Sequence, residues 1–147
     1  MSAPTERQQW MSLLACAPAG RIAALWAELA REPEFTWLRQ PEIGGVMVRG
    51  RMGGTGGPFN LGEMTVTRCS LRLSCGTLGH AYVQGRDKAK ARIAALCDAL
   101  MQTGEAAVIR TRILEPLTSE AKATRRSTAE KAASTKVDFF TMVRGED

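Results

Sequence analysis

The sequence predicts an α+β protein: N-terminal helices, an antiparallel β-meander, amphipathic helices and a docked, extended C-terminal segment. Two observations predict this class. Apolar residues recur at helical spacing before residue 40 and after residue 87, and they alternate at strand spacing in three consecutive segments between these regions. The length of 147 residues, with 44% apolar and 24% charged residues, fits one domain over residues 1–147 with a core of its own.

The first forty residues predict two helices. Thr5 and Gln8 have the spacing of a capping box, and Pro18 separates the two helical patterns. The apolar stripes consist of Trp10, Leu13 and Leu14 in the first helix, and of Ile22, Leu25, Trp26 and Leu29 in the second.

Three strands are predicted next, over 46–52, 61–73 and 80–84. In the first strand, Val46, Val48 and Met52 share one face, whereas Arg49 and Arg51 share the other, which is typical of a half-buried strand. The glycine-rich stretch 53–58 is predicted to be a turn, and a second turn lies over 75–79.

The second strand has an irregular apolar phase. Met64 and Val66 share one parity, whereas Cys69, Leu71 and Leu73 take the other. One extra residue would reconcile the two patterns, so we expect a bulge or a sharp bend near Thr67–Arg68.

Asp87 is the expected N-cap of the next helix, and Gly104 is its expected stop. Residues 108–114 fit a short strand or more helix. Pro116 opens a polar helical segment to about Ala133, which we expect to be exposed to solvent or to lie against a partner. The last residues are too apolar for a free tail, so we expect this end to be docked.

Charge and cysteine content limit the class of protein. The net charge of +5 favours anionic partners, but the basic residues are spread along the chain. The four cysteines form no CxxC pair, and with a single histidine they predict no metal site; we expect reduced, mostly buried thiols in a cytoplasmic protein. Leu13–Cys16 resembles a lipoprotein cleavage box, but it lacks a basic start and a long apolar run, so we expect neither a signal peptide nor a membrane span.

Three features are candidates for chemistry. His80 has no evident nucleophile motif beside it, and a structural role is favoured. The glycine loop lacks the Lys-Ser/Thr and the helix of a P-loop, and Asp87 competes with any anion for the amides of the next helix. Arginines beside these features could still hold a phosphate or a partner carboxylate. The candidate ligand or partner contacts are therefore Arg49, Arg51, Gly53, Gly54, Gly56, Gly57 and Arg86.

No catalytic set emerges from these residues, which is typical of a subunit rather than of an autonomous enzyme. Several segments, in order, resemble the PhnG family, a subunit of bacterial carbon–phosphorus lyase. These segments are RQQWMSLLA, RMGGTGGPFNLGEMTVTRCSLRL, GHAYVQGRDKAKA, DALMQ and VDFFTMVRGED.

The resemblance implies a role in phosphonate degradation within an obligate hetero-oligomer. PhnH-, PhnI- and PhnJ-type proteins are the implied partners in a core complex, and PhnH-, PhnI- and PhnL-type proteins are the implied partners in the first committed step. That step displaces adenine from ATP with methylphosphonate and gives α-D-ribose 1-methylphosphonate 5-triphosphate. ATP and methylphosphonate are substrates of the complex, and the resemblance implies no cofactor, no metal and no established catalytic residue for this chain.

An obligate subunit needs apolar surface for its partners. The candidate subunit interface is therefore the C-terminal set Phe139, Phe140, Met142, Val143 and Arg144, together with the arginine face and the glycine loop.

Two alternatives from other classes remain open. A small basic nucleic-acid-binding module would use the RGRMGG stretch and the basic region 121–126. Its 5% aromatic content, however, provides few side chains on which nucleic-acid bases could stack. An independent small enzyme would depend on His80 and would be active alone.

Overall fold

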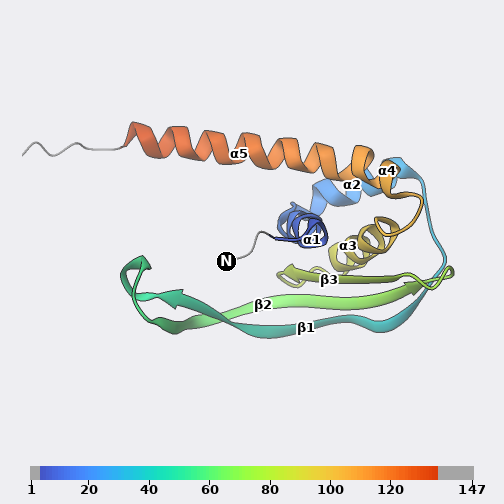
Figure 1. Ribbon diagram of the computed structural model, residues 1–147, viewed down its shortest axis with the longest axis horizontal. Coiled ribbons are helices and arrows are strands. Elements are labelled where there is room, and N and C mark those ends of the chain that lie inside the picture. The colour runs from blue at the N-terminus through green and yellow to red at the C-terminus, as the bar shows by residue number, and fades with distance from the viewer. Residues whose placement is uncertain (1–3, 136–147) are drawn as a thin grey trace, which may run out of the picture.

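The computed structural model describes residues 4–135. Two helices, α1 (Glu6–Cys16) and α2 (Ala19–Leu29), precede the strands β1 (Phe35–Arg51), β2 (Pro58–Leu73) and β3 (Leu78–Gln84). The remaining helices are α3 (Lys88–Leu100), α4 (Ala106–Ile109) and α5 (Glu115–Ser134). The α+β class is thus confirmed, and the helices lie on one side of the sheet (Figure 1).

Both N-terminal helices begin as the sequence predicts. The capping box is present, because the Gln8 amide donates to Thr5 Oγ1 at 3.3 Å and the Thr5 amide donates to Gln8 Oε1 at 2.8 Å. Pro18 is the N-cap residue of α2, where its missing N–H leaves no backbone donor unsatisfied. Ile22, Leu25 and Trp26 bury the predicted face of α2.

The three strands form an antiparallel meander in the order β1-β2-β3, as predicted. Both β1 and β2 are longer than expected, because the segment around Pro41 continues β1 and the stretch from Pro58 continues β2. The predicted half-buried strand is only partly correct. Val46 and Val48 are half-buried, but Met52 is 67% exposed in the short 3₁₀ turn η1 (Met52–Gly54).

The predicted extra residue in β2 is wrong. From Val66 to Arg72, β2 pairs with β3 without interruption, through the Thr67–Arg68 step. The nearby irregularities belong to β1, where residues are inserted between Trp37 and Glu42. Pro41 lies in this irregular stretch, which accommodates a residue that cannot donate to the ladder. The change of apolar phase along β2 therefore has another cause, described below.

The core lies between the sheet and the helices, with α3 at its centre. Ten residues of α3 are buried, and Asp87 caps the helix by accepting from the Lys90 amide at 2.8 Å, as predicted. Gly79 of β3 allows a close approach, because a Cβ there would lie 2.1 Å from the Ala95 carbonyl oxygen.

Residues 108–114, for which strand and helix both remained open, are helical. They run from α4 through one widened turn, the π-helical segment η2 (Arg110–Leu114), into α5. Ile109, Ile113 and Leu117 are buried at four-residue spacing, which is the period of a helix and not of a strand. Pro116 lies in the first turn of α5, where a missing amide is tolerated.

Two further expectations concern cysteines and membranes. All four thiols are free, but only Cys69 and Cys97 are buried, whereas Cys16 and Cys75 are exposed at the end of α1 and in the β2–β3 turn. The expectation of mostly buried thiols is thus only half correct. Within residues 4–135 no single helix is long and apolar enough to cross a bilayer; only α1 and α2 together have the length and composition, and they are bent by 111°.

Candidate functional site: the hairpin arm

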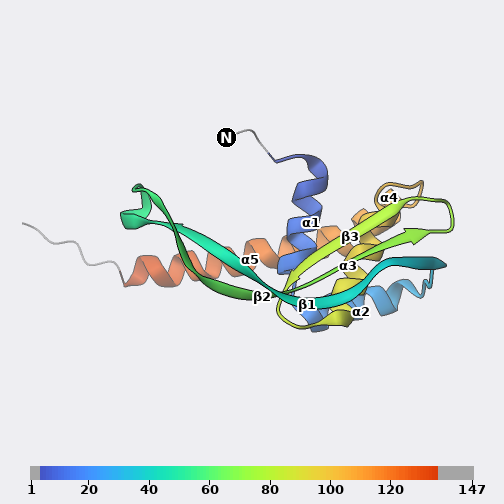
Figure 2. The same cartoon turned by 90° about the horizontal axis from the view of Figure 1, so that it is seen from below.

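The most prominent surface feature is a two-stranded arm, residues 43–64, which we call the hairpin arm. Strand β3 pairs with β2 only from Val66 to Arg72, so the rest of β2 toward the tip has β1 as its sole neighbour. Figures 1 and 2 both show this ribbon projecting beyond β3 and α3. A two-stranded hairpin is only marginally stable in water by itself, so its long exposed surface needs an explanation.

The predicted glycine loop forms the tip of the arm. Gly53 and Gly54 have positive φ angles of 58° and 81°, which favour glycine. The Gly56 amide donates to the Met52 carbonyl at 2.7 Å, and a Cβ at Gly56 would meet that oxygen at 2.6 Å. A strand and not a helix follows, so no helix N-terminus adds amide donors for a phosphate here. The glycines are thus accounted for by the tight turn.

Arg49 and Arg51 lie beside this loop, as predicted. Both are exposed, and Arg51 Nη1 donates to the Gly56 carbonyl at 3.2 Å. Within the described part of the chain neither guanidinium forms an ion pair with an acidic side chain. They remain available for an anion or for a carboxylate of another chain.

Arg86 is not part of the same cluster. The Gly85 amide donates to the Thr65 carbonyl at 2.9 Å, and Thr65 pairs with Gly45, so Arg86 lies near the base of the arm. Arg49 is four residues further toward the tip, roughly 13 Å along the strand. The structure therefore separates the predicted contacts into a tip group and a base position.

His80 has a neighbour that sequence reasoning missed. Its Nδ1 lies 2.9 Å from Ser70 Oγ, because the two residues are directly paired across β2 and β3. Strand pairing decides this contact, and no local motif announces it. The pair is exposed, and no carboxylate among the described residues hydrogen-bonds to the imidazole. It lacks the orienting acid and the water exclusion that activate a serine nucleophile.

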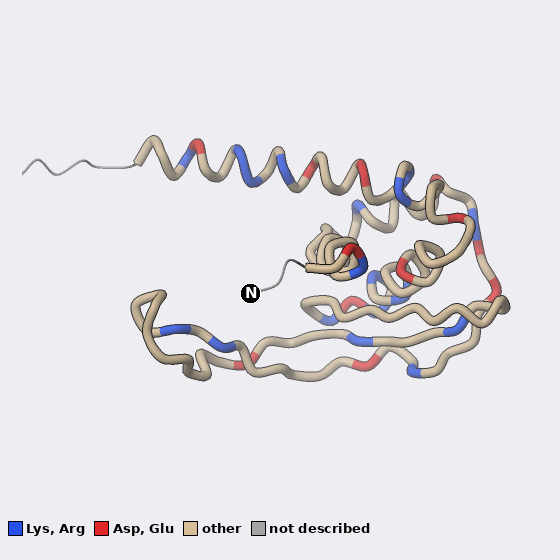
Figure 3. Tube along the Cα trace, in the orientation of Figure 1, with Lys and Arg blue, Asp and Glu red and all other residues tan. Residues whose placement is uncertain are grey.

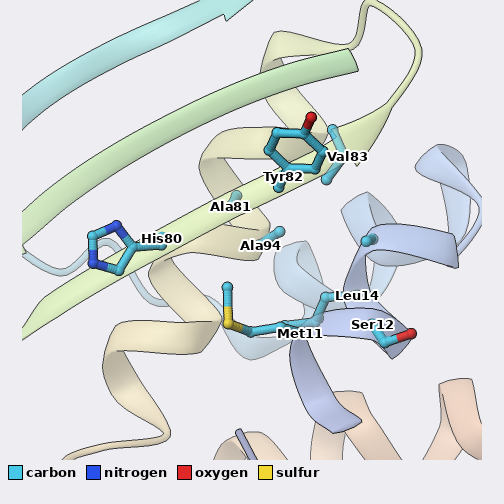
Figure 4. Close-up of a pocket in the computed structure, with 9 residues that line it drawn as sticks. Met11, Ser12, Leu14, His80, Ala81, Tyr82, Val83 and Ala94 are labelled. Atoms are coloured by element: carbon cyan, nitrogen blue, oxygen red, sulfur yellow. The ribbon is translucent and has the colours of Figure 1, made fainter. Parts of the chain in front are cut away.

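A shallow pocket borders this strand. It lies between Met11 and Leu14 of α1 and His80 and Tyr82 of β3 (Figure 4). Its volume is about 160 Å³, whereas pockets for drug-sized ligands typically measure about 300–1,000 Å³. This pocket is too small to enclose a nucleoside triphosphate.

A buried carboxylate holds the pocket walls in place. Asp98 of α3 is fully buried and accepts four hydrogen bonds: from Arg7 Nε at 3.1 Å, Arg7 Nη2 at 2.7 Å, Trp10 Nε1 at 2.9 Å and the His80 amide at 2.9 Å. The pKa of Arg7 is raised chiefly by its hydrogen bond to Asp98. An acid inside the apolar run Leu96–Leu100 was the sequence signal for such a buried, satisfied carboxylate. Its role is structural, because all its partners lie within the chain.

The second projecting element is α5. Every residue from Lys122 to Thr135 is exposed, and α5 extends in the same direction as the hairpin arm in both views (Figures 1 and 2). Along α5 two acidic residues, Glu115 and Glu120, come before the basic group 122–126 (Figure 3), and Arg126 pairs with Glu130 at 2.8 Å. The predicted polar helix is thus exposed here, and its basic residues Lys122, Arg125 and Arg126 have the i, i+3, i+4 spacing of one helix face.

The candidate subunit interface at the C-terminus, Phe139 to Arg144, lies outside the described residues. Within the described chain, no group of three His, Cys, Asp or Glu side chains is placed to hold a metal ion.

The fold defines a class: a small α+β protein with a hairpin arm and a helix that extend outward from its body. Comparison with known proteins identifies the family within this class. The family model for the phosphonate metabolism protein PhnG matches residues 5–145. A curated protein of Rhizobium meliloti (strain 1021), "Alpha-D-ribose 1-methylphosphonate 5-triphosphate synthase subunit PhnG", is 47% identical over 142 residues, which cover 97% of this chain and 91% of that protein. The chain belongs to the PhnG family.

Proposed function

We propose that this chain is the PhnG subunit of α-D-ribose 1-methylphosphonate 5-triphosphate synthase and acts in phosphonate metabolism. The single observation that carries the proposal is the 47% identity to the Rhizobium meliloti synthase subunit over 97% of the chain. The family match over residues 5–145 supports treating the chain as one domain. The protein is a subunit of a multi-subunit transferase and not an enzyme by itself.

The partners are PhnH-, PhnI- and PhnL-type subunits for the synthase step, with a PhnJ-type subunit in the core complex. In that step the phosphonate oxygen of methylphosphonate bonds to the ribose C1′ of ATP as the C1′–N9 bond breaks, and adenine leaves with a proton. The nucleotide and the phosphonate are substrates of the complex, and no cofactor resides in this chain. The complex works in the cytoplasm.

The geometry supports a contributing role for this chain rather than a self-sufficient reaction centre. The pocket beside β3 is too small for ATP, and the larger hollow of about 550 Å³ beside Phe35 and Arg72 is open to solvent. The Ser70–His80 pair is exposed, and no acid among the described residues hydrogen-bonds to its imidazole. Arg49, Arg51 and the glycines at the arm tip are the proposed contacts with a partner subunit or a phosphate, and Arg86 is a second such position. The C-terminal residues Phe139, Phe140, Met142, Val143 and Arg144 are proposed to contact a partner subunit as well.

The test is release of adenine from ATP and methylphosphonate, measured by chromatography. Three incubations are compared: the purified partner subunits with this chain, the partner subunits without it, and this chain alone. We expect release only when the chain and its partners are combined. Release at the same rate without the chain, or by the chain alone, would contradict the proposal.

Variants at the arm tip refine this test. Arg49→Gln and Arg51→Gln should lower adenine release, since each removes a cation beside the tip that forms no ion pair within residues 4–135. A rise in KM for ATP or methylphosphonate would assign the arginines to a substrate, whereas weaker co-purification would assign them to a partner. Arg112→Gln is the matched control, because Arg112 is exposed, lies in η2 in the body of the protein and forms no ion pair within residues 4–135. Loss of activity in the control as large as in the tip variants would remove the arm tip from the site.

A further inference from the structure

The hairpin arm has two chemically different faces. Every second residue of β1 in the arm lies on one face: Gly44, Val46, Val48 and Gly50. The register shift beside Val48 does not interrupt this alternation, because its extra residue lies in β2. Their partners across the ribbon complete this face. Gly44 pairs with Val66, Val46 with Met64, Val48 with Gly62 and Gly50 with Phe59.

Leu61 belongs to the same face. A Cβ built on Gly50 would lie 3.4 Å from the Phe59 ring and 3.8 Å from Leu61 Cβ, so both side chains gather over this glycine. We call this set the apolar arm face. It consists of Val46, Val48, Phe59, Leu61, Met64 and Val66, with glycines at 44, 50 and 62.

The opposite face of the arm carries its charges. Arg49, Arg51 and Glu63 are the only charged residues between 43 and 64. Arg49 and Arg51 alternate with Gly50, and Glu63 pairs with Met47, so all three lie opposite the apolar arm face. This opposite face also exposes Ile43 (46%) and Met47 (54%), so it is mixed, whereas the apolar arm face carries no charged side chain.

The apolar arm face points away from the chain's own core. Thr67, Cys69 and Leu71 of β2 are buried on the side of the sheet that the helices cover, whereas Met64 and Val66 have the other parity. All helices lie on the first side (Figure 1). Val66 is only 4% exposed, yet it is separate from the main core cluster. The apolar phase of β2 thus changes because its apolar residues face the helices from Thr67 onward and face the other side of the sheet before it.

The exposure of this face is large for a protein in solution. Phe59 is 41% exposed and Leu61 is 66% exposed. Further along the same side of the sheet, Tyr82 pairs with Arg68 and Leu78 pairs with Arg72, and their exposed fractions are 48% and 38%. Exposed apolar side chains that gather at one place, as Phe59 and Leu61 do over Gly50, mark an interaction site.

The charges beside this face select the kind of partner. Arg68 and Arg72 lie on the same side of the sheet, as does Arg39, which pairs with Ser70. Glu42 lies 3.8 Å from Arg39 and 3.7 Å from Arg68, and Glu32 and Glu34 line one hollow together with Arg72, so arginines outnumber acidic side chains on this side only slightly. A second copy docked face to face would oppose two surfaces with the same slight excess of positive charge, which like-charge repulsion disfavours.

We infer that the apolar arm face is the docking surface for another subunit of the synthase, one that presents apolar side chains flanked by acidic residues. This inference rests on the proposed function, which makes the chain a subunit, and it adds the surface and the chemistry of the partner. No layer of the described chain covers the apolar arm face, and in this inference the partner subunit packs on it instead.

Two glycines allow a sharp test. A Cβ at Gly44 or at Gly62 would meet nothing within 4 Å, and neither glycine has a positive φ angle, so a larger side chain fits the isolated chain. Gly62→Arg would place a long cation where the partner must pack. Gly104→Arg is the matched control, since Gly104 has the same free space and lies in the loop after α3.

The experiment measures binding of each purified variant to the reconstituted partner subunits by interferometry, and thermal unfolding of each isolated variant. For Gly62→Arg we expect at least about tenfold weaker binding, which corresponds to about 1.4 kcal/mol, with an unchanged melting temperature. Gly104→Arg should bind as the wild type does. If Gly62→Arg unfolds, Leu61→Lys replaces it, because the Leu61 side chain is already 66% exposed.

Each outcome separates the surface from the function. Unchanged binding and adenine release by Gly62→Arg and by Leu61→Lys would overturn the docking surface while leaving the subunit role intact. A wild-type chain that neither binds the partners nor supports adenine release would overturn the proposed function. A wild-type dimer that Gly62→Arg dissociates would assign the face to a second copy and overturn the inference.

Discussion

At the residue scale, Asp98 is the side chain on which the packing of α1, β3 and α3 depends. It is fully buried, and its donors come from Arg7 and Trp10 on α1 and from the backbone of β3. Since an unsatisfied buried polar group is costly, the hydrogen bonds around Asp98 fix the angle at which α1 meets the sheet.

We predict that Asp98→Asn lowers the free energy of unfolding by about 2–4 kcal/mol. Both Asp98 oxygens accept hydrogen bonds, so the NH₂ group of an asparagine would point at N–H donors and could not accept from them. Urea denaturation of the isolated chain measures this loss. Glu105→Gln is the matched control, since Glu105 pairs with Arg31 at 2.6 Å on the surface, where such a pair contributes about 0–1 kcal/mol. Equal losses in the two variants would show that Asp98 has no special structural role.

The four thiols should differ in reactivity toward iodoacetamide at pH 8. Burial raises the pKa of Cys69 to about 11 and that of Cys97 to about 12, so both stay protonated and inaccessible in the folded protein. A hydrogen bond from Thr77 lowers the pKa of the exposed Cys75 thiol. Mass spectrometry should therefore find only Cys16 and Cys75 alkylated until denaturant is added.

Thr77→Val tests the cause of the Cys75 reactivity. It removes the hydroxyl that lies 3.3 Å from the sulfur, so alkylation of Cys75 should slow while that of Cys16 is unchanged.

The raised pKa values of Cys69 and Cys97 have a consequence at alkaline pH. Because unfolded thiols ionise near pH 9 and folded Cys69 and Cys97 do not, stability should fall as the pH rises above about 9.

At the scale of elements, the contact between α3 and β3 sets the architecture. Gly79 lets the helix approach the strand so closely that a Cβ would lie 2.1 Å from the Ala95 oxygen and 2.8 Å from Ala99 Cβ. The backbone of a buried helix cannot move aside as a flexible side chain can. The helix and the strand therefore pack this closely only because residue 79 has no side chain.

We therefore predict that Gly79→Ala destabilises the protein by about 1–3 kcal/mol or more, through overpacking. Gly62→Ala, where a Cβ meets nothing within 4 Å, should change stability by less than about 0.5 kcal/mol. Thermal unfolding of the two variants is the measurement. A Gly79→Ala protein that melts with the wild type would mean that α3 shifts without penalty.

At the scale of the whole molecule, the chain consists of a packed body with two projecting elements. The hairpin arm and the distal part of α5 extend in the same direction, and neither is covered by the rest of the described chain (Figures 1 and 2). Isolated helices and two-stranded hairpins are each marginal in water, so both elements are suited to become ordered surfaces of a larger assembly.

The C-terminal residues predict a third contact for that assembly. Phe139→Asp with Phe140→Asp should abolish co-purification with the partner subunits, because two charges would replace the apolar pair at the expected interface. Ala23→Asp with Ala24→Asp is the control for charge, since both residues are exposed on α2 in the body of the protein. Normal assembly of the phenylalanine variant would remove this segment from the interface.

Much of the fold was accessible from local patterns. Helical and strand periods located α1, α2, α3, α5 and part of each strand, the Thr5 and Asp87 caps fixed two helix starts, and the glycine loop marked the arm tip. Residues 35–45 of β1 were not predicted to be a strand, and 108–114 were left open between strand and helix. The strand ends and the bulge were harder to predict. The insertion in β1 around Pro41 depends on how β1 pairs with β2, and β2 alone cannot reveal which strand carries the extra residues.

Part of the candidate site was predictable too. Arg49 and Arg51 were recognised from their alternation and their place beside the glycine loop. Arg86 was grouped with them because it also lies near glycine, but strand pairing places it at the base of the arm. The Ser70–His80 contact and the pocket beside α1 arise from segments that are distant in sequence, so no local pattern indicated them.

The sequence by itself determined the class of fold, the order of its elements and membership of the PhnG family, because periodicity, caps and similarity are written along the chain. Only the tertiary structure decided that Asp98 joins Arg7 across 91 residues and that the apolar phase change in β2 turns a hydrophobic face away from the core. The physical reason is the same in both cases. Which side of a strand or helix is buried depends on what packs against it, and that partner can be a distant segment or another subunit.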